Sequence, residues 1–199
     1  MIRTMKGKLF ILSGQSGVGK NTILKAVLAK HPAFHRAVTC TTREQRPEEI
    51  PGEDHYFVYP EKFQEMINNG EFLEYAQVHG EMYGTPKEQI EKALASGKNV
   101  LMEIDVKGAV QVKEKNPDAI LIFVKYEPGD LEILIRSRLK NDPGRGQVTE
   151  EEIQTRITTA KKEAEYEKFY DYSITNPEGH SEQAIGAVEK IIQDELKKN

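Results

Sequence analysis

Residues 8–22, with the sequence KLFILSGQSGVGKNT, place a run of apolar residues directly before a glycine-rich turn and the start of a helical pattern. The turn fits the spacing G-x-x-x-x-G-K. In that pattern glycines let backbone N–H groups converge on phosphate oxygens, while the lysine and the helix N-terminus add positive potential. We therefore predict a buried strand, a phosphate-binding loop and a helix, in this order. The candidate phosphate-binding residues are Gly14, Gln15, Ser16, Gly17, Val18, Gly19, Lys20, Asn21 and Thr22.

One position departs from the full pattern. A Ser or Thr normally follows the lysine, and this chain has Asn21 there, with Thr22 next. The difference concerns magnesium, because the hydroxyl at that position is a metal ligand. Three arrangements stay open: the Asn21 amide oxygen binds the metal, the Thr22 hydroxyl binds it, or water supplies most of the ligands.

Apolar runs alternate with helical patterns along the rest of the chain. Further buried strands are expected at 99–105, 119–125 and 172–175. Helices are expected at 21–30 and near 86–96, 107–115, 130–140, 149–169 and 181–198. Such alternation predicts an α/β fold with a parallel sheet covered on both faces. Two stretches break this alternation. Short β-like pieces in residues 39–94 predict a small mixed α+β insert, and the charged, helical pattern of residues 131–165 predicts a hairpin.

Composition excludes several classes of protein. The chain has 199 residues, of which 38% are hydrophobic and 30% charged, and a formal net charge of −4. Mild acidity argues against nucleic acid or an anionic membrane as the main partner. The single cysteine, Cys40, excludes an internal disulfide and a cysteine-rich zinc site. The apolar run Leu9–Leu12 is too short for a signal peptide or a membrane span, so we expect a cytoplasmic protein. No sequence feature predicts an oligomeric state.

A second phosphate site is indicated by residues 41–46, TTREQR. Arg43 and Arg46 stand three residues apart beside two threonine hydroxyls. Two guanidinium groups that converge on one dianionic phosphate would form a strong site with defined geometry. Taken alone, the stretch is equally compatible with a solvated basic loop.

Four segments together resemble the guanylate kinases. They are GQSGVGK (14–20), TTREQRPEEIPGEDHYF (41–57), EFLEYAQVHGEMYGTP (71–86) and EIDVKGA (103–109), followed by an Arg-Gly pair at 145–146. The resemblance covers nearly the whole chain in the family's order. It implies a three-layer α/β P-loop kinase with a parallel-sheet core (1–38, 95–130 and 166–199), a small α+β GMP-binding insert (39–94) and a helical lid (131–165).

The resemblance also implies the activity and the residues that perform it. The reaction would be the Mg²⁺-dependent transfer of the ATP γ-phosphoryl group to GMP, with ATP and GMP as the partners. The implied GMP-binding residues are Thr39, Arg43, Arg46, His55, Glu74, Tyr83, Thr85 and Asp105. The implied catalytic residues are Lys20, Arg43, Arg145 and Arg156. The implied metal ligands are Asn21 and Asp105.

The implied base-reading pair suits guanine chemically. A carboxylate at Glu74 can accept hydrogen bonds from guanine N1–H and N2–H₂ side by side, and the Thr85 hydroxyl can donate to O6. Adenine would leave the desolvated carboxylate facing a lone pair, and a site of this kind discriminates by up to about 10⁴-fold. No general base is needed, because the second pKa of the acceptor phosphate is about 6.

Some positions depart from the family pattern. His55 stands where a phosphate-binding tyrosine is usual, so His55 donates, Tyr56 takes its place, or the contact is absent. Glu48 replaces a usual glycine and adds negative charge beside the arginine loop. The loop at 140–144 is longer than usual, so Arg138 is an alternative to Arg145 as the first catalytic arginine of the lid. Two other functions stay open: a non-catalytic guanylate-kinase-like module that binds phosphopeptides, and a kinase for another small phosphorylated acceptor.

Overall fold

The central sheet is built from the apolar runs of the sequence. The computed structural model of the chain describes residues 7–78, 80–126, 129, 131–140 and 148–198. The sheet has the strand order β2-β7-β1-β8-β9. Its strands are β1 (Leu9–Gly14), β2 (His35–Arg36), β7 (Val100–Glu103), β8 (Ile120–Tyr126) and β9 (Tyr172–Asn176). The pairs β2/β7 and β8/β9 are parallel. β1 is buried along its whole length, as expected for a strand covered on both faces.

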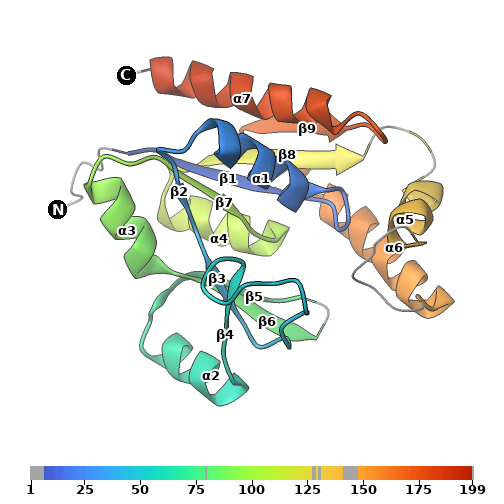
Figure 1. Cartoon of the computed structure of the whole chain (residues 1–199), viewed down its shortest axis with the longest axis horizontal. Coiled ribbons are helices and arrows are strands. Elements are labelled where there is room, and N and C mark those ends of the chain that lie inside the picture. The colour runs from blue at the N-terminus through green and yellow to red at the C-terminus, as the bar shows by residue number, and fades with distance from the viewer. Residues whose placement is uncertain (1–6, 79, 127–128, 130, 141–147, 199) are drawn as a thin grey trace. The chain divides into compact units, whose positions relative to one another are not determined.

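The chain divides into two compact units, and strand β1 contributes to both. The first unit contains residues up to Ile11 and His31–Ile120. Besides β2 and β7 it holds α3 (Lys87–Ala95) and α4 (Val106–Lys115). It also holds a second sheet of order β4-β3-β6-β5. The elements of this part are β3 (Thr39–Thr41), β4 (His55–Phe57), α2 (Pro60–Asn68), β5 (Phe72–Val78) and β6 (Glu81–Pro86). Helix α4 packs on β5 (Figure 1).

A small apolar core stabilises the second sheet. Cys40, Phe63, Met66 and Phe72 are buried together, and the rings of Phe63 and Phe72 stack with centroids 4.6 Å apart. These four side chains come from β3, α2 and β5, so α2 closes one face of the sheet. Thr39 and Thr41 flank Cys40 in β3, so the polar residues described below lie on the opposite face of the same sheet.

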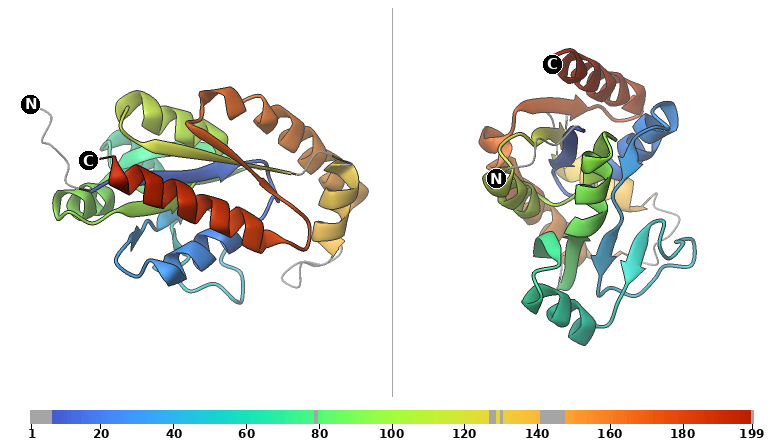
Figure 2. Two further views of the ribbon diagram at one scale, coloured as in Figure 1. Left: turned by 90° about the horizontal axis from the view of Figure 1, so that it is seen from above. Right: turned by 90° about the vertical axis from the view of Figure 1, so that its left-hand side faces the viewer.

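The second unit contains Leu12–Lys30 and Leu121–Asn199. Its helices are α1 (Lys20–Lys30), α5 (Leu131–Lys140), α6 (Glu150–Ala164) and α7 (Ser181–Lys197), with a short 3₁₀ turn at Glu167–Phe169. Helix α7 packs against α1 and β9, and Lys30 of α1 pairs with Glu189 of α7 at 2.9 Å. Figure 2 shows α5 beside α6, in agreement with their packing contacts.

Most elements expected from periodicity are confirmed, with three differences. Helix α2 and the two-residue strand β2 were not expected. The helix expected over 149–169 ends at Ala164, and the chain continues as the 3₁₀ turn. The α/β fold and the mixed character of the insert are confirmed, whereas the three-part division of the chain stays a prediction. No helix in the described part of the chain combines the length and apolarity needed to cross a membrane.

Candidate functional site

The phosphate loop, residues 14–19, connects β1 to α1 in the second unit. Gly14, Gly17 and Gly19 have φ values of +134°, +77° and +93°, which other residues adopt only with strain. Gly14 is further constrained by space, because a Cβ there would lie 2.0 Å from the Val124 carbonyl oxygen of β8. The next backbone N–H, that of Gln15, donates to the same oxygen at 3.1 Å. The glycines therefore allow the loop to turn directly beside β8.

The Gln15 side chain fastens this loop on two sides. It is buried, and its Nε2 donates to the Ala160 carbonyl oxygen of α6 at 3.1 Å. Its Oε1 accepts from the Tyr126 backbone N–H at 2.8 Å. Beside it, the Ser16 N–H donates to Glu163 Oε2 of α6 at 2.5 Å. Helix α6 and the end of β8 are thus both joined to the phosphate loop.

Lys20 lies at the first position of α1 with its ammonium group turned over the loop. Nζ donates to the carbonyl oxygens of Gly14 at 2.8 Å and Gln15 at 2.9 Å. These contacts hold a positive charge above the glycine-rich turn. The next two residues, Asn21 and Thr22, are exposed at the start of the helix. A loop of N–H groups with a lysine and a helix N-terminus is suited to a polyphosphate.

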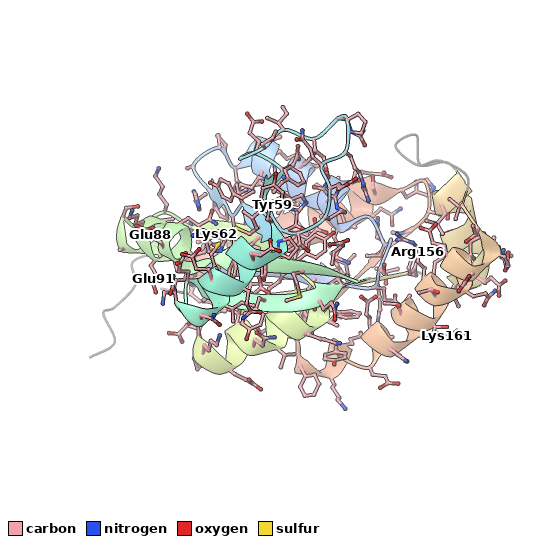
Figure 3. The ribbon with its side chains drawn as sticks, turned by 90° about the horizontal axis from the view of Figure 1, so that it is seen from below. Tyr59, Lys62, Glu88, Glu91, Arg156 and Lys161 are labelled. Carbon is pink, nitrogen blue, oxygen red and sulfur yellow. The ribbon has the colours of Figure 1, made fainter. Side chains whose placement is uncertain are left out.

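Arg156 lies on α6, on the same face as the two residues that contact the loop. Ala160 follows it by four residues and Glu163 by seven, so the three positions line one side of the helix. Its Nε lies 3.5 Å from Glu152 Oε1, and its side chain is 16% exposed. Figure 3 shows Arg156 and Lys161 extending from different sides of α6. Arg145 lies outside the described residues, as does the side chain of Arg138.

The arginine loop is held by a glutamate that sequence reasoning missed. Arg43 Nη2 donates to Glu49 Oε1 at 2.7 Å, and the Arg46 backbone N–H donates to Glu49 Oε2 at 2.9 Å. Burial alone would raise the pKa of Glu49, but these donors outweigh burial and the pKa is lowered. Glu48, which the sequence singled out, is exposed. The signal for Glu49 was its spacing of three residues from Arg46, which closes a turn with a 3.1 Å backbone hydrogen bond.

The remaining donors of Arg43 are also engaged, and they orient it toward the second sheet. Nε donates to the Tyr83 hydroxyl oxygen at 3.2 Å, and Nη1 donates to the Glu44 carbonyl oxygen at 2.6 Å. The Arg46 guanidinium makes no hydrogen bond or ion pair with any residue that the structure describes. Arg43 and the Arg46 backbone therefore hold the Glu49 carboxylate, and Tyr83 contacts Arg43 rather than Glu49.

His55 belongs to the same cluster, and Tyr56 does not. Thr39 Oγ1 lies 2.7 Å from His55 Nδ1, and the rings of His55 and Tyr83 are 6.0 Å apart in an edge-to-face arrangement. Burial, and then the charge of Arg43, lowers the pKa of His55. Tyr56 is exposed on the other face of β4. We call Thr39, Arg43, Arg46, His55 and Tyr83 the phosphate site.

A buried carboxylate lies beside this cluster in the first unit. Glu74 on β5 is 2% exposed and is paired in register with Thr85 on β6. The Thr85 hydroxyl donates to Glu74 Oε1 at 2.6 Å. Burial raises the pKa of Glu74 to about 7, and the negative charge of Asp105 adds to the effect. A carboxylate kept dry and partly protonated in this way is typical of a functional site rather than of a structural ion pair.

Gly108 makes room for this carboxylate at the start of α4. A Cβ on Gly108 would lie 2.4 Å from Glu74 Oε2. Asp105 caps the same helix, because its Oδ1 accepts from the N–H groups of Lys107 at 2.8 Å and Gly108 at 3.2 Å. No sequence pattern identified Gly108 beyond its place in EIDVKGA. We call Glu74, Thr85, Asp105 and Gly108 the base site.

The two residues that the resemblance implies as magnesium ligands belong to different units, Asn21 to the second and Asp105 to the first, and no preformed metal cluster is present in the described ranges. The exposed Asn21 amide makes no hydrogen bond with a described residue. Asp105 uses Oδ1 as a helix cap, which leaves Oδ2 available. Both offer hard oxygen ligands of the kind that Mg²⁺ takes together with phosphates and water.

Comparison with known proteins gives consistent results. A family model described as guanylate kinase matches residues 6–195. The guanylate kinase of Lactococcus lactis subsp. lactis (strain IL1403) is 44% identical over 190 residues, which cover 96% of this chain and 89% of the relative. That of Clostridioides difficile (strain 630) is 42% identical over 193 residues, with coverage of 97% and 90%. The crystal structure of guanylate kinase from Anaplasma phagocytophilum superposes with a TM-score of 0.75 and 27% identity, and covers 99% of this chain and 89% of that one.

Proposed function

Because the chain belongs to the guanylate kinase family, we propose that its phosphate loop binds ATP and that its phosphate and base sites bind GMP. The chain is an ATP:GMP phosphotransferase. In this reaction a phosphate oxygen of GMP attacks the γ-phosphorus of ATP, the bond to the β,γ-bridging oxygen breaks, and ADP and GDP result. Neither the comparisons nor the described residues favour a phosphopeptide-binding module or a kinase for a different acceptor.

The single observation that carries the assignment of the base site is the buried Glu74 carboxylate. Guanine N1–H and N2–H₂ would donate to its two oxygens and replace the hydration that burial removed. The Thr85 hydroxyl, which donates to Glu74 in the free protein, would then turn to guanine O6. Adenine offers an acceptor at N1 and no amino group at C2, so it would leave the carboxylate without donors.

The phosphate site supplies positive charge and donors for the monophosphate. Arg43 is already oriented by Glu49 and Tyr83, and the Arg46 guanidinium is available among the described residues. Binding a phosphate at a preorganised guanidinium loses less side-chain entropy than binding at a mobile one. The acceptor oxygen is largely ionised near neutral pH, so these residues align it and no side chain has to remove a proton.

Transfer itself would depend on charge stabilisation in the second unit. Lys20 would exchange its two loop carbonyls for the β- and γ-phosphate oxygens, and Arg156 would meet the charge that develops on the transferred group. Magnesium would neutralise phosphate charge when bound, with Asn21 or Thr22 and Asp105 as the protein residues that hold it. Arg145 stays a predicted partner of Arg156, and a cytoplasmic location stays a prediction.

Direct binding measurements test these assignments. Titration calorimetry should show ATP binding by the wild type that Lys20→Ala weakens at least tenfold, with GMP binding unchanged. Arg43→Ala should weaken GMP binding by a similar factor and leave ATP binding unchanged, since charge-assisted hydrogen bonds contribute roughly 1.5–3 kcal/mol. If Arg43→Ala weakened ATP binding instead, the assignment of the two nucleotides to these sites would be wrong.

A further inference from the structure

We propose that Thr39 holds His55 in the neutral form that carries its proton on Nε2, and that this N–H donates to the phosphate of bound GMP. The inference rests on the proposed GMP site. It adds the identity of the donor that replaces a tyrosine hydroxyl, and it gives Thr39 a role as a positioning residue rather than as a direct ligand.

Strand pairing places the residues concerned on one face of the second sheet. Thr39 of β3 is the register partner of His55 in β4, and Thr41 is the partner of Tyr83 in β6. Thr39 and Thr41 are two residues apart, so they point to the same face, as do their partners. His55 therefore projects beside Tyr83, whose hydroxyl accepts from Arg43. Strand pairing therefore places the His55 ring near Arg43, because both contact Tyr83.

The contact with Thr39 fits either neutral tautomer, because the hydroxyl can donate to Nδ1 or accept from it, and the phosphate decides between them. The distance from Thr39 Oγ1 to His55 Nδ1 is 2.7 Å, which is a hydrogen bond. A threonine hydroxyl that donates to Nδ1 leaves the proton of a neutral imidazole on Nε2. Nε2 makes no hydrogen bond with a residue in the described ranges. The reverse tautomer would present a bare lone pair on Nε2 to the phosphate, which an anion would repel.

The charges around His55 keep it neutral near pH 7. Burial lowers its pKa first, and the positive charges of Arg43 and Arg36 lower it further. Glu49 and Asp54 act in the opposite direction, but they do not outweigh the other effects. Both carboxylates are themselves paired with arginines, Glu49 with Arg43 and Asp54 with Arg36. A cationic ring beside Arg43 and Arg36 would thus be costly here, whereas a neutral N–H donor is not.

Nitrogen NMR of histidine-labelled protein at pH 8 tests the proposal directly, because the chemical shifts of Nδ1 and Nε2 distinguish both tautomers and the cation. The His55 signals can be assigned by their loss in His55→Tyr. We expect the Nε2-protonated neutral form in the GMP complex. A ring protonated on Nδ1, or a cationic ring, in the complex would overturn the proposal.

A matched pair of variants tests the role of Thr39. Thr39→Val removes the hydroxyl and keeps the shape, and should raise the Kd for GMP roughly tenfold while the Kd for ATP is unchanged. Thr39→Ser keeps the hydroxyl and should stay within about twofold of the wild type. Equal affinity of the Val and Ser variants for GMP would refute the positioning role. If the wild type bound no GMP at all, the proposed function itself would fail, which is a different result from GMP binding with the wrong tautomer.

Discussion

Replacing Glu74 by glutamine should make the protein more stable and a poorer enzyme. The carboxylate is buried, and its pKa is raised from the ordinary 4.5 to about 7. The folded protein therefore binds this proton more tightly than the unfolded chain does. The free energy of unfolding must fall as the pH rises from about 4.5 to about 7, and the whole loss is present above pH 7. It amounts to about 3 kcal/mol, because each unit of pKa corresponds to about 1.4 kcal/mol.

A glutamine at position 74 avoids the cost of a buried negative charge, but it cannot replace the carboxylate in guanine recognition. Its Oε1 still accepts from the Thr85 hydroxyl, so the buried hydrogen bond is kept. At pH 8 Glu74→Gln should raise the free energy of unfolding by up to about 3 kcal/mol, and near pH 5 the difference should be small. Toward guanine, an amide accepts one hydrogen bond and directs its NH₂ at another donor. The loss of roughly 1.5–3 kcal/mol corresponds to a fall of about 10- to 150-fold in kcat/KM for GMP.

Urea unfolding at pH 5 and pH 8, with steady-state kinetics at pH 8, measures both effects. Glu91→Gln is the matched control, because it makes the same chemical change at an exposed position of α3 (Figure 3). The control should leave stability and kinetics unchanged. A Glu74→Gln variant no more stable than the wild type at pH 8 would show that the buried carboxylate carries no cost. Unchanged kcat/KM for GMP would remove Glu74 from the base site.

Three further variants probe the contacts around the two sites. Gly108→Ala should favour helix α4 by up to about 1 kcal/mol, which thermal unfolding measures. It should also lower kcat/KM for GMP at least tenfold, because the new Cβ displaces the Glu74 carboxylate. Unchanged kcat/KM for GMP would contradict this displacement. Gln15→Ala leaves buried backbone groups unpaired and should lower the free energy of unfolding by about 2 kcal/mol in urea titrations. An unchanged urea midpoint would contradict this prediction. Arg156→Ala should lower kcat by about 10³-fold with little change in the KM for GMP. Lys161→Ala on another side of α6 is its control, and equal kcat values in the two variants would exclude Arg156 from catalysis.

Local patterns were enough to predict the elements around the phosphate loop. The apolar run of β1, the glycines and the following helical period follow one another within residues 8–30, and each has a local physical cause. Strand β2 has two residues, too few for any period, and exists because it pairs with β7. Helix α2 begins at a proline and is nine residues long, and it is stabilised by Phe63 and Met66 packing under the second sheet.

The parts of the site that could not be predicted depend on contacts that are distant in sequence. Gln15 meets the Ala160 carbonyl 145 residues away, and no local signal connects the two. Gly108 belongs to the motif EIDVKGA, but a glycine is needed there because Glu74 Oε2, from strand β5, occupies the space of a Cβ. His55 was identified by its position in the resemblance, and its hydrogen bond with Thr39 comes from the pairing of β3 with β4.

A coupled assay of ADP release with GMP, AMP, CMP and UMP as acceptors shows whether the enzyme phosphorylates GMP in preference to other nucleoside monophosphates. We expect rapid, magnesium-dependent ADP release with GMP, and at least about 100-fold lower kcat/KM with each of the other three nucleotides. Lys20→Ala, measured in parallel, should abolish release with all four. Equal rates with AMP and GMP would contradict the assignment of Glu74 and Thr85 to guanine recognition. ADP release that Lys20→Ala left near normal would contradict the kinase mechanism itself.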